Sequence, residues 1–276
     1  MKTYKILIPV FNDWESLFNL LSNIHDLKIN NLGHIKILII DDCSTDLLDK
    51  KLEFKSFADI EIIKNSKNVG HGKSIANGIN YLTKKKDFDC LIVMDGDGED
   101  RPEEIKDLII KSFNFPSSTI TANRVKRSEG FLFKIFYQLH KFLTLILTGK
   151  SIKFGNFMCI PIEDLKSLAN NKSLFVSFSG TVAKFVKNKI HINSIRGIRY
   201  KGHTKMTFIK LIRHSLLIIS VFKNKVSYRL FIISIIYVFL ITLFVKKNII
   251  FLILPIIIIN LLILFVLFYL YEKNYN

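Results

Sequence analysis

The chain has 276 residues, of which 49% are hydrophobic, and a formal net charge of +17 at pH 7. This length is enough for one sizeable domain and an additional segment. Its three cysteines are far apart and form no Cys-x-x-Cys pair, which favours buried, reduced thiols over a zinc site or a disulfide framework. No carboxylate occurs between Asp164 and Glu272, and this basic stretch leads into apolar segments. We therefore expect anionic lipid headgroups or a lipid phosphate as the partner of the basic region, and no nucleic acid.

The first predicted strand covers residues 4–10, and a polar turn closes it at residues 9–13 (Pro-Val-Phe-Asn-Asp). A helical pattern begins near Trp14, with apolar residues repeating on one face. Because the first three residues run directly into this strand, we expect no signal peptide and a first domain that stays in the cytoplasm.

Two further strands are predicted at residues 34–40 and 60–63. The first of them ends in an acidic cluster at residues 41–46 (Asp-Asp-Cys-Ser-Thr-Asp), for which the alternative role is capping of a following helix. The second leads to residues 68–73 (Asn-Val-Gly-His-Gly-Lys), which open a helix that continues to about residue 82.

The fourth predicted strand, residues 90–94, ends abruptly in residues 95–100 (Asp-Gly-Asp-Gly-Glu-Asp), before a helix at residues 102–112. A buried parallel strand would present these carboxylates at its C-terminal edge, where ligand crevices form in open α/β sheets. Asp95 and Asp97 project to the same side of an extended chain, and two such carboxylates can hold a hard divalent cation. The alternative is an acidic turn that is only solvated.

A fifth predicted strand, residues 119–122, leads to Arg124. Strands that alternate with helices predict an α/β fold, with a mostly parallel sheet and helices on both of its faces. The first strand is not followed by Gly-x-Gly-x-x-Gly, and residues 70–73 lack the Walker A spacing. We therefore expect neither a Rossmann dinucleotide site nor a P-loop.

The motifs at residues 9–13, 41–46, 68–73 and 95–97 occur in the order and spacing of family 2 glycosyltransferases, and the chain resembles this family. The resemblance implies the GT-A fold, a UDP- or GDP-linked sugar as donor, and a divalent cation, Mg²⁺ or Mn²⁺. It implies Asp97 and Asp95 as metal ligands and catalytic residues, with Glu99 as a further catalytic candidate. The donor-nucleotide site that it implies consists of Pro9, Asn12, Asp41, Asp42, Asn68, Gly70, Lys73 and Asp95.

Two motifs in the second half of the chain indicate which members of this family it resembles most. Residues 154–157 resemble a Gly-Asp-Phe-Arg element, with Asn156 in place of Asp. Residues 196–205 resemble the Arg-x-x-Gly-x-Ser-Lys run of polyprenyl-phosphate glycosyltransferases, with Thr in place of Ser. This resemblance implies a polyprenyl phosphate as acceptor, and the guanidinium fork of arginine suits phosphate oxygens. We expect the acceptor phosphate to contact Arg124, Lys134, Arg199, Thr204 and Lys205.

Residues 230–245 and 249–271 are almost wholly apolar, and as helices they would extend about 24 Å and about 34 Å, against about 30 Å of hydrocarbon. We expect a transmembrane hairpin, with one span plus an in-plane helix as the alternative, and an amphipathic interfacial helix at residues 206–222. The expected domains are a catalytic domain at 1–204, an interfacial segment at 205–228 and a hairpin at 229–276. The protein would be a multi-pass protein of the inner membrane with a cytoplasmic catalytic domain, although Lys246 and Lys247 between the spans conflict with the positive-inside rule.

The expected reaction is transfer of the sugar to the acceptor phosphate with inversion at the anomeric carbon. A phosphate with a second pKa of about 6 is largely ionised in the cytoplasm, so no strong general base is required. The alternatives are transfer to a hydroxyl of a lipid-linked or cell-envelope glycan, with Glu99 or Asp100 as base, and a membrane-anchored binding protein without turnover. A processive synthase is less favoured, because its Gln-x-x-Arg-Trp motif is missing and Trp14 is the only tryptophan. The sequence leaves a homo-oligomer open.

Overall fold

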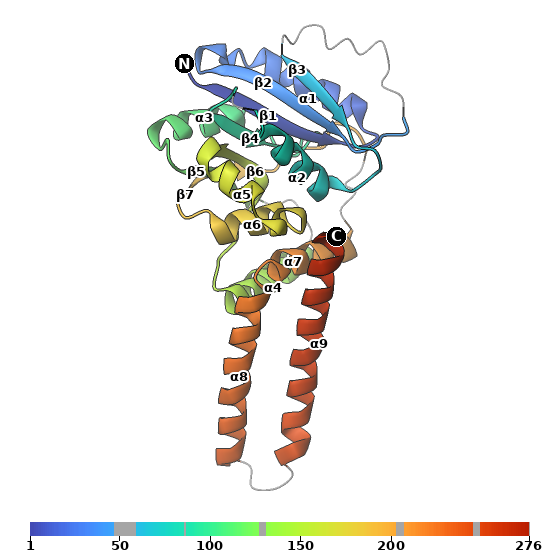
Figure 1. Cartoon of the computed structure of the whole chain (residues 1–276), viewed down its shortest axis with the longest axis vertical. Coiled ribbons are helices and arrows are strands. Elements are labelled where there is room, and N and C mark those ends of the chain that lie inside the picture. Colours follow the sequence, from blue (N-terminus) through green and yellow to red (C-terminus); the bar gives the residue numbers. More distant parts are fainter. Residues whose placement is uncertain (47–58, 86, 127–130, 203–206, 245–248, 276) are drawn as a thin grey trace. The chain divides into compact units, whose positions relative to one another are not determined.

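The computed structural model of the protein describes residues 1–46, 59–85, 87–126, 131–202, 207–244 and 249–275 (Figure 1). Contacts within the chain define two compact units. The first unit comprises Met1–Ser128 with Lys153–Thr207, and the second comprises Glu129–Ile152 with Phe208–Asn276. The expected interfacial segment and hairpin thus belong to the second unit, together with a helix from the middle of the chain.

The first unit is built on a seven-stranded sheet with the strand order β3-β2-β1-β4-β6-β5-β7. Its strands are β1 (Thr3–Val10), β2 (His34–Asp41), β3 (Ile60–Lys64), β4 (Cys90–Val93), β5 (Thr119–Lys126), β6 (Phe154–Pro161) and β7 (Lys189–Ile195). Four of the strand pairings are parallel, and the two that β6 makes are antiparallel. The predicted mostly parallel sheet is confirmed, and β6 and β7 extend it beyond the five strands predicted.

Helices cover both faces of this sheet, and the consecutive residues of β1 and β4 are accordingly buried on both sides. On one face, Ile6 and Ile8 of β1 join a single core cluster with α1 (Trp14–Asp26) and α3 (Glu104–Asn114). On the other face, Gly78 of α2 (His71–Leu82) lies against Leu7 and Ile40, where no larger side chain would fit. The helices α5 (Ile162–Ala169) and α6 (Phe178–Phe185) pack beside α2 and against β6.

The register of the sheet brings several strand ends to one edge. In the parallel pairs, Val10 lies opposite Asp41, and Leu7 lies opposite Val93. The Met94 N–H then donates to the Leu7 carbonyl oxygen (3.2 Å), which continues the pairing by one residue. The loops that follow β1, β2 and β4 therefore emerge side by side, as expected for the C-terminal edge of a parallel sheet.

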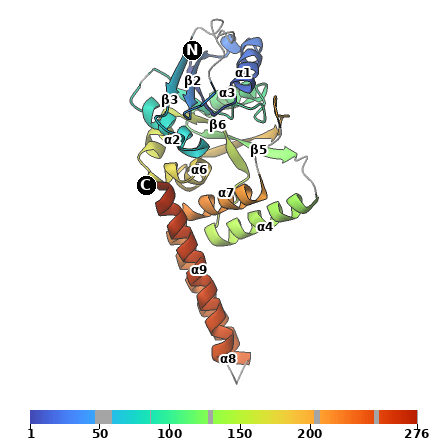
Figure 2. The ribbon, with the colours of Figure 1, turned by 90° about the vertical axis from the view of Figure 1, so that its right-hand side faces the viewer.

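The second unit consists of α4 (Phe131–Thr148), α7 (Phe208–Ser220), α8 (Lys223–Phe244) and α9 (Ile249–Tyr275). Within this unit, α4 and α7 lie alongside each other (Figure 2). Two segments of α8 and α9, Lys223–Phe244 and Phe251–Tyr275, are long and apolar enough to cross a membrane, with mean hydropathies of 2.1 and 3.2. Only 11% and 6% of these windows are buried, so neither resembles the core helix of a soluble protein.

The structure lengthens the helix that contains the first of the two expected spans. The apolar stretch alone begins at residue 230, but α8 begins at Lys223 and has 22 residues. The helix as a whole extends about 33 Å, but its first seven residues include Lys223, Lys225 and Arg229. These charged residues suit the interface of a bilayer, and the apolar part of the helix keeps the length expected from the sequence.

Polar contacts join the helices of the second unit. The Asn260 amide of α9 donates to Ser234 Oγ of α8 (2.6 Å), and Lys223 at the start of α8 pairs with Glu272 near the end of α9 (2.8 Å). Arg229 of α8 donates to the Ile146 carbonyl oxygen (2.5 Å) at the C-terminal end of α4. Since this carbonyl has no partner within its own helix, Arg229 fastens α4 to α8. One stretch of α4 leaves large apolar side chains exposed: Leu139, Phe142, Leu143, Leu145 and Ile146.

A charged cluster on the sheet gives the first testable prediction. Glu61 of β3 pairs with Lys85 (2.8 Å) and with Lys5 (3.4 Å), whose side chain is only 5% exposed. Burial opposes the charged carboxylate, but Lys85 and Tyr81 bind it and lower the pKa of Glu61 below its usual value. We expect Glu61→Gln to cost about 1–2 kcal/mol of stability at pH 7, because Lys5 loses its counter-ion.

The expected pH dependence follows from the direction of this shift. A lowered pKa in the folded state stabilises the protein above the ordinary pKa of glutamate, and this contribution is lost as the pH falls through the lowered value. The difference in melting temperature between the wild type and Glu61→Gln should therefore shrink below about pH 4.5. A difference that is constant down to pH 3.5 would contradict this assignment.

Candidate active site

Residues 95–100 form a compact loop, here called the acidic loop, between β4 and α3 at the edge where β1 and β2 also end. The Asp95 N–H donates to Asp100 Oδ2 (2.9 Å), and the Glu99 N–H donates to Asp97 Oδ1 (3.0 Å). Gly98 has a φ of +89°, a conformation that glycine adopts without strain. The loop thus folds around its own carboxylates, and its tight turn depends on a glycine.

Each carboxylate of the acidic loop faces a basic side chain from another part of the first unit. The pairs are Asp95 with His71 (3.1 Å), Asp97 with Arg199 (2.6 Å), Glu99 with Arg196 (2.6 Å) and Asp100 with Arg124 (3.2 Å). His71 is the first residue of α2, Arg124 belongs to β5, and the other two arginines follow β7. Four carboxylates can remain close together and largely buried because each has a cation beside it.

These surroundings give the carboxylates different acidities. Burial disfavours the charged form of Asp95, but His71 holds the pKa of this carboxyl down at about 2. Burial and the nearby charge of Asp95 raise the pKa of Asp100 to about 7, and the same two causes raise the pKa of Asp97. One carboxyl of the loop is therefore strongly acidic, whereas its two neighbours retain protons more readily, and an additional cation would favour their charged forms.

His71 is a site residue that the sequence analysis did not single out. Its Nε2 lies 3.1 Å from Asp95 Oδ1 and 3.1 Å from the Asn156 amide nitrogen of β6. Burial alone would lower the pKa of His71, but the Asp95 carboxylate raises it above its ordinary value. His71 and Asn156 each lie in a motif that is visible in the sequence. The contact between their side chains, however, arises only when the sheet brings the two motifs together.

Residues 196–202, here called the basic segment, run along the acidic loop. The Gly197 N–H donates to the Glu99 carbonyl oxygen (2.8 Å), and the Tyr200 N–H donates to the Asp97 carbonyl oxygen (3.0 Å). A side chain at Gly197 would clash with the carbonyl oxygen of Gly98, so only glycine permits this approach. The basic segment is thereby fixed to the acidic loop through its backbone as well as its arginines.

The basic segment also reaches α1 and the loop before it. Arg199 donates to Asp13 in addition to Asp97, and Lys201 pairs with Glu15. The Asn23 amide donates to the Tyr200 hydroxyl (2.8 Å). Asp13 and Arg196 are further residues of this site for which the sequence analysis assigned no role.

The two expected nucleotide-binding aspartates lie at the end of β2 and are only 4% and 3% exposed. Asp41 accepts a hydrogen bond from the Ser44 N–H (2.8 Å). Asp42 accepts from the Val69 N–H (2.9 Å) and the Gly70 N–H (2.8 Å), just before α2 begins. Both carboxylates organise the loops at this edge of the sheet, and their contact with a base or ribose stays a prediction.

The other expected donor residues lie at the same edge. Pro9 is buried near the end of β1 opposite Ile40. Asn12 has a φ of +48°, and its Oδ1 accepts from the Thr45 N–H (2.9 Å), which joins the loops after β1 and β2. Lys73 lies in the first turn of α2. The remaining two, in the loop before α2 and at its N-terminal cap, are Asn68 and Gly70.

Of the five residues expected to bind the acceptor phosphate, the structure describes the side chains of two. Arg124 and Arg199 both contact the acidic loop, through Asp100 and Asp97. Lys134 belongs to α4 of the second unit, and its side chain lies outside the described part. The last two expected residues, Thr204 and Lys205, also lie outside the described residues.

Within the described residues, no group of three or more His, Cys, Asp or Glu side chains is arranged to hold a metal ion. Two carboxylates of the acidic loop nevertheless have the chemistry that a hard divalent cation requires, those of Asp95 and Asp97. Their proximity contributes to the raised pKa of Asp97, so a cation between them would relieve an existing repulsion. In the structure, Arg199 already occupies one oxygen of Asp97.

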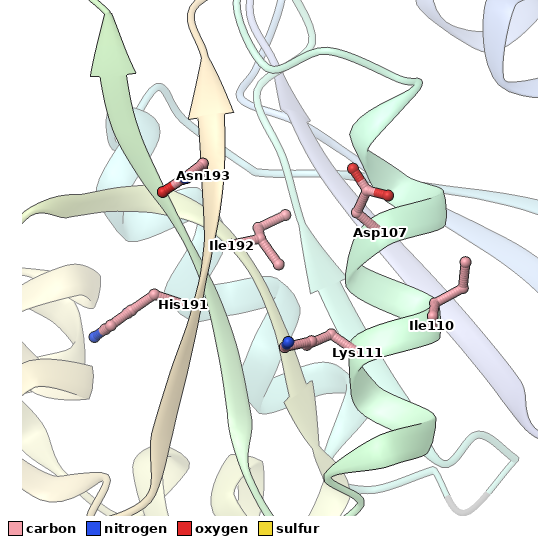
Figure 3. A pocket seen from close by; sticks show the side chains of 6 residues that line it. All are labelled: Asp107, Ile110, Lys111, His191, Ile192 and Asn193. Atoms are coloured by element: carbon pink, nitrogen blue, oxygen red, sulfur yellow. The ribbon is translucent and has the colours of Figure 1, made fainter.

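A separate hollow of about 370 Å³ lies between α3 and β7 and is lined by Asp107, Ile110, Lys111, His191, Ile192 and Asn193 (Figure 3). In this view the Ile192 side chain points toward α3, whereas the His191 side chain points away from it. The hollow shares no lining residue with the acidic loop or its counter-ions. Its two charged lining side chains, of opposite sign on one helix, indicate a solvated surface, and we assign the chemistry to the acidic loop.

The sequence profile described as Glycosyl transferase family 2 matches residues 5–174, which is more than half of the chain. One curated relative is the undecaprenyl-phosphate 4-deoxy-4-formamido-L-arabinose transferase of Klebsiella pneumoniae subsp. pneumoniae, which is 26% identical over 223 residues. The alignment covers 77% of this chain and 65% of the length of that relative.

Solved structures give the same fold. The mannosyl-3-phosphoglycerate synthase of Rubrobacter xylanophilus is 15% identical, with a TM-score of 0.55 over 83% of this chain and 74% of that one. The glucosyl-3-phosphoglycerate synthase of Mycobacterium tuberculosis, in complex with Mn²⁺, UDP-glucose and phosphoglyceric acid, is 14% identical, with a TM-score of 0.56 over 82% and 80% of the two chains. At these identities the likeness concerns the fold alone.

The contacts of Asp42 yield a prediction about the architecture of the site. Its carboxylate accepts three hydrogen bonds, two from backbone N–H groups and one from the Asn65 amide (3.0 Å), at the N-terminus of α2. Asp42→Ala should therefore cost about 2–4 kcal/mol, because it leaves buried donors unpaired and removes a negative charge from a helix N-terminus. In thermal unfolding, a loss of roughly 5–10 °C is expected.

The matched control is Asp59→Ala, which removes an exposed carboxylate from the end of the loop before β3. Its melting temperature should stay within about 2 °C of the wild type. Equal melting temperatures for Asp42→Ala and Asp59→Ala would show that Asp42 does not organise the start of α2.

Proposed function

Since this chain belongs to glycosyl transferase family 2 and is a glycosyltransferase, we propose that it transfers a sugar from a nucleotide-diphosphate donor to a polyprenyl phosphate. The observation that carries this proposal is the acidic loop at the edge of the sheet, with a cation beside each carboxylate. Such an arrangement of carboxylates and arginines is suited to a ligand that combines phosphate groups with a divalent cation.

The donor would lie along the loops after β1, β2 and β4. The neighbouring synthase from Mycobacterium tuberculosis holds UDP-glucose and Mn²⁺, and its GT-A-like fold supports a donor site at the corresponding edge here. In this chain, Gly70 at the N-terminal cap of α2, which Asp42 holds, and Gly72 in the first turn are open: an added side-chain carbon would meet no neighbouring atom within 4 Å. Backbone N–H groups at a helix N-terminus are favourable neighbours for a diphosphate.

Asp95 and Asp97 would hold the divalent cation, Mg²⁺ or Mn²⁺. When bound, such a cation neutralises the charge that develops on a departing diphosphate. His71 keeps Asp95 in its charged form, because its positive charge lowers the pKa of that carboxyl. The Asn156 amide lies 3.1 Å from the same ring nitrogen, Nε2, that faces Asp95, and it also hydrogen-bonds Asp95, so it lies beside both members of the pair.

A phosphate acceptor requires less of the site than a hydroxyl acceptor does, because arginines already bind the two candidate bases. A hydroxyl needs a general base, and the sequence offered Glu99 and Asp100 for this role. Arg196 binds both oxygens of Glu99 (2.6 Å each), and Asp100 is 3% exposed and bound by Arg124. A phosphate monoester is already largely ionised at neutral pH and needs no such base. The name of the curated relative, an undecaprenyl-phosphate sugar transferase, supports the same class of acceptor.

In the proposed reaction, an oxygen of the acceptor phosphate attacks the anomeric carbon opposite the leaving group. The new carbon–oxygen bond forms as the bond to the nucleoside diphosphate breaks, and the diphosphate leaves with the electron pair. The configuration at the anomeric carbon is inverted. The chain contributes by orienting the donor and by stabilising negative charge, which are the main sources of rate in group transfer between phosphates.

The reaction would take place at the cytoplasmic face of the inner membrane. We propose that α8 and α9, which are long and apolar enough to cross a membrane, anchor the chain there as two spans. The Lys223–Glu272 pair brings the start of one helix and the end of the other together. The amphipathic α7 and the exposed apolar side chains of α4 support further contact with lipid. Lys246 and Lys247, between the two spans, lie outside the described residues and remain in conflict with the positive-inside rule.

The test of this function uses the full chain in detergent or vesicles, with labelled UDP- and GDP-sugars and either a polyprenyl phosphate or a lipid-linked glycan. A sugar–phosphate–lipid product, identified by mass spectrometry, is expected only with the polyprenyl phosphate. Transfer only to the glycan would establish the alternative acceptor, and binding of nucleotide sugar without turnover would establish a binding protein.

The first variant for this assay is Asp97→Asn. We expect it to lower the transfer rate by at least about 100-fold, because a neutral amide stabilises neither a cation nor the leaving diphosphate as a carboxylate does. Asp107→Asn removes an exposed carboxylate from α3, away from the acidic loop, and should retain the wild-type rate. Full activity of Asp97→Asn would remove Asp97 from the site.

The second variant, Glu99→Gln, separates the two acceptor classes. If Glu99 serves mainly to bind Arg196, its replacement should lower the rate by no more than about tenfold, the effect of one weakened ion pair. If Glu99 were the base for a hydroxyl acceptor, the loss would be about 100- to 10,000-fold, and the acid limb of the pH–rate profile would disappear.

A further inference from the structure

Arg199 occupies the carboxylate that a cation at the acidic loop would need. Its Nη1 donates to Asp97 Oδ2 (2.6 Å), and the other oxygen of Asp97 accepts from the Glu99 N–H (3.0 Å). The two side chains of this ion pair are only 11% and 20% exposed. Both oxygens of Asp97 are therefore already in use, and a cation can gain one only if a present partner leaves.

The partner that can leave is the arginine. The Glu99 N–H belongs to the turn of the acidic loop itself, whereas Arg199 reaches Asp97 from a segment about 100 residues away in the sequence, and it has a second acceptor in Asp13. Loss of the Asp97 contact would thus leave the guanidinium with one carboxylate. The Nε–H also donates to the Lys201 carbonyl oxygen (2.8 Å), so the Nη1 N–H groups released by Asp97 are the ones that would be available to phosphate oxygens.

The charges around Asp97 favour replacement of Arg199 by another cation over departure of Arg199 without a replacement. Asp95 and Asp97 lie close enough for their charges to interact, so removal of Arg199 without replacement would leave two neighbouring carboxylates short of positive charge. A divalent cation restores that charge. A phosphate in turn supplies the negative charge that the released arginine requires.

We propose that Arg199 is an exchangeable counter-ion, which neutralises Asp97 in the ligand-free protein and transfers to phosphate oxygens when a divalent cation takes its place. This inference rests on the proposed cation and donor site. It deepens that site by stating that the cation and the phosphate ligand bind cooperatively, because each removes the unpaired charge that the other would leave. Each ligand should therefore raise the affinity for the other by the same factor.

The contrasting interpretation is a permanent salt bridge. The backbone contacts of Gly197 and Tyr200 hold the basic segment on the acidic loop in either case. If the Arg199–Asp97 pair only added to this attachment, its removal would lower stability without strengthening cation binding. The two interpretations therefore differ in the sign of the effect on cation affinity.

The test measures Mn²⁺ binding to the purified full chain in detergent by electron paramagnetic resonance, with no sugar present and no turnover. For the wild type, we expect weak Mn²⁺ binding that UDP or GDP strengthens by about tenfold or more. For Arg199→Gln, we expect Mn²⁺ alone to bind about tenfold more tightly than to the wild type, and the nucleotide to add little. Unchanged Mn²⁺ affinity of Arg199→Gln, or an undiminished nucleotide effect, would overturn the inference.

A matched control and a second variant keep the result interpretable. Arg213→Gln removes an exposed arginine from α7 of the second unit and should bind Mn²⁺ as the wild type does. If Arg199→Gln does not fold, Arg199→Lys, which keeps the charge but loses the fork, is measured instead. In Arg199→Lys, the nucleotide should strengthen Mn²⁺ binding less than it does in the wild type. The affinity for Mn²⁺ alone should change less than in Arg199→Gln.

Two further arms identify the phosphate and separate this inference from the proposed function. Replacing the nucleotide by a polyprenyl phosphate shows which ligand takes Arg199, and Arg199-dependent strengthening of Mn²⁺ binding by either one supports the inference. Strengthening by neither would overturn it. Asp97→Asn should abolish tight Mn²⁺ binding in both backgrounds. If Mn²⁺ binding does not depend on Asp97, the proposed cation site itself is wrong, and the inference fails with it.

Discussion

Carboxylates that are buried together at one edge of a sheet need positive charge beside them, and this need organises the first unit. Asp95 and Asp100 are joined through the backbone of the acidic loop, so their charges are held within a few ångströms. Water reaches these side chains only in part and screens their repulsion incompletely, and each carboxylate has its own basic partner. Those partners come from the start of α2, from β5 and from the segment after β7. The acidic loop is thus the point at which distant parts of the chain must meet.

The same requirement explains why basic side chains surround the acidic loop. Internal cations satisfy the carboxylates, and none of the described residues form a group of three or more potential metal ligands. A glycosyltransferase that uses a cation and a diphosphate must release both after each turnover, when the product nucleotide departs. An internal arginine that pairs with Asp97 at that stage would neutralise its negative charge after the cation has left. The counter-ions therefore suit a site that is alternately filled and emptied.

In the second unit the main constraint is different: much of its apolar surface is exposed. The segments of α8 and α9 that could cross a membrane are almost entirely unburied, and in water such surface would be strongly unfavourable. Contacts between Asn260 and Ser234, and between Arg229 and the end of α4, satisfy polar groups that lipid could not. The inclusion of α4 in this unit joins a helix from the middle of the sequence to the C-terminal helices. The exposed apolar surface of this unit thus draws on two separated parts of the chain.

The sequence alone determined the alternation of strands and helices, the apolar C-terminal segments and the motifs that end the strands, because these features follow from local periodicity and turn chemistry. It did not reveal β6 and β7, nor the antiparallel pairs of β6, since pairing across a sheet is a non-local choice. Asp95, Asp97 and Arg199 stood out as candidates for a site. Only the tertiary structure decided that Arg199 binds Asp97 and Asp13, and that His71 binds Asp95. The physical reason is that the pairing of charges depends on distances in space, and residues about 100 positions apart acquire such distances only when the sheet has formed.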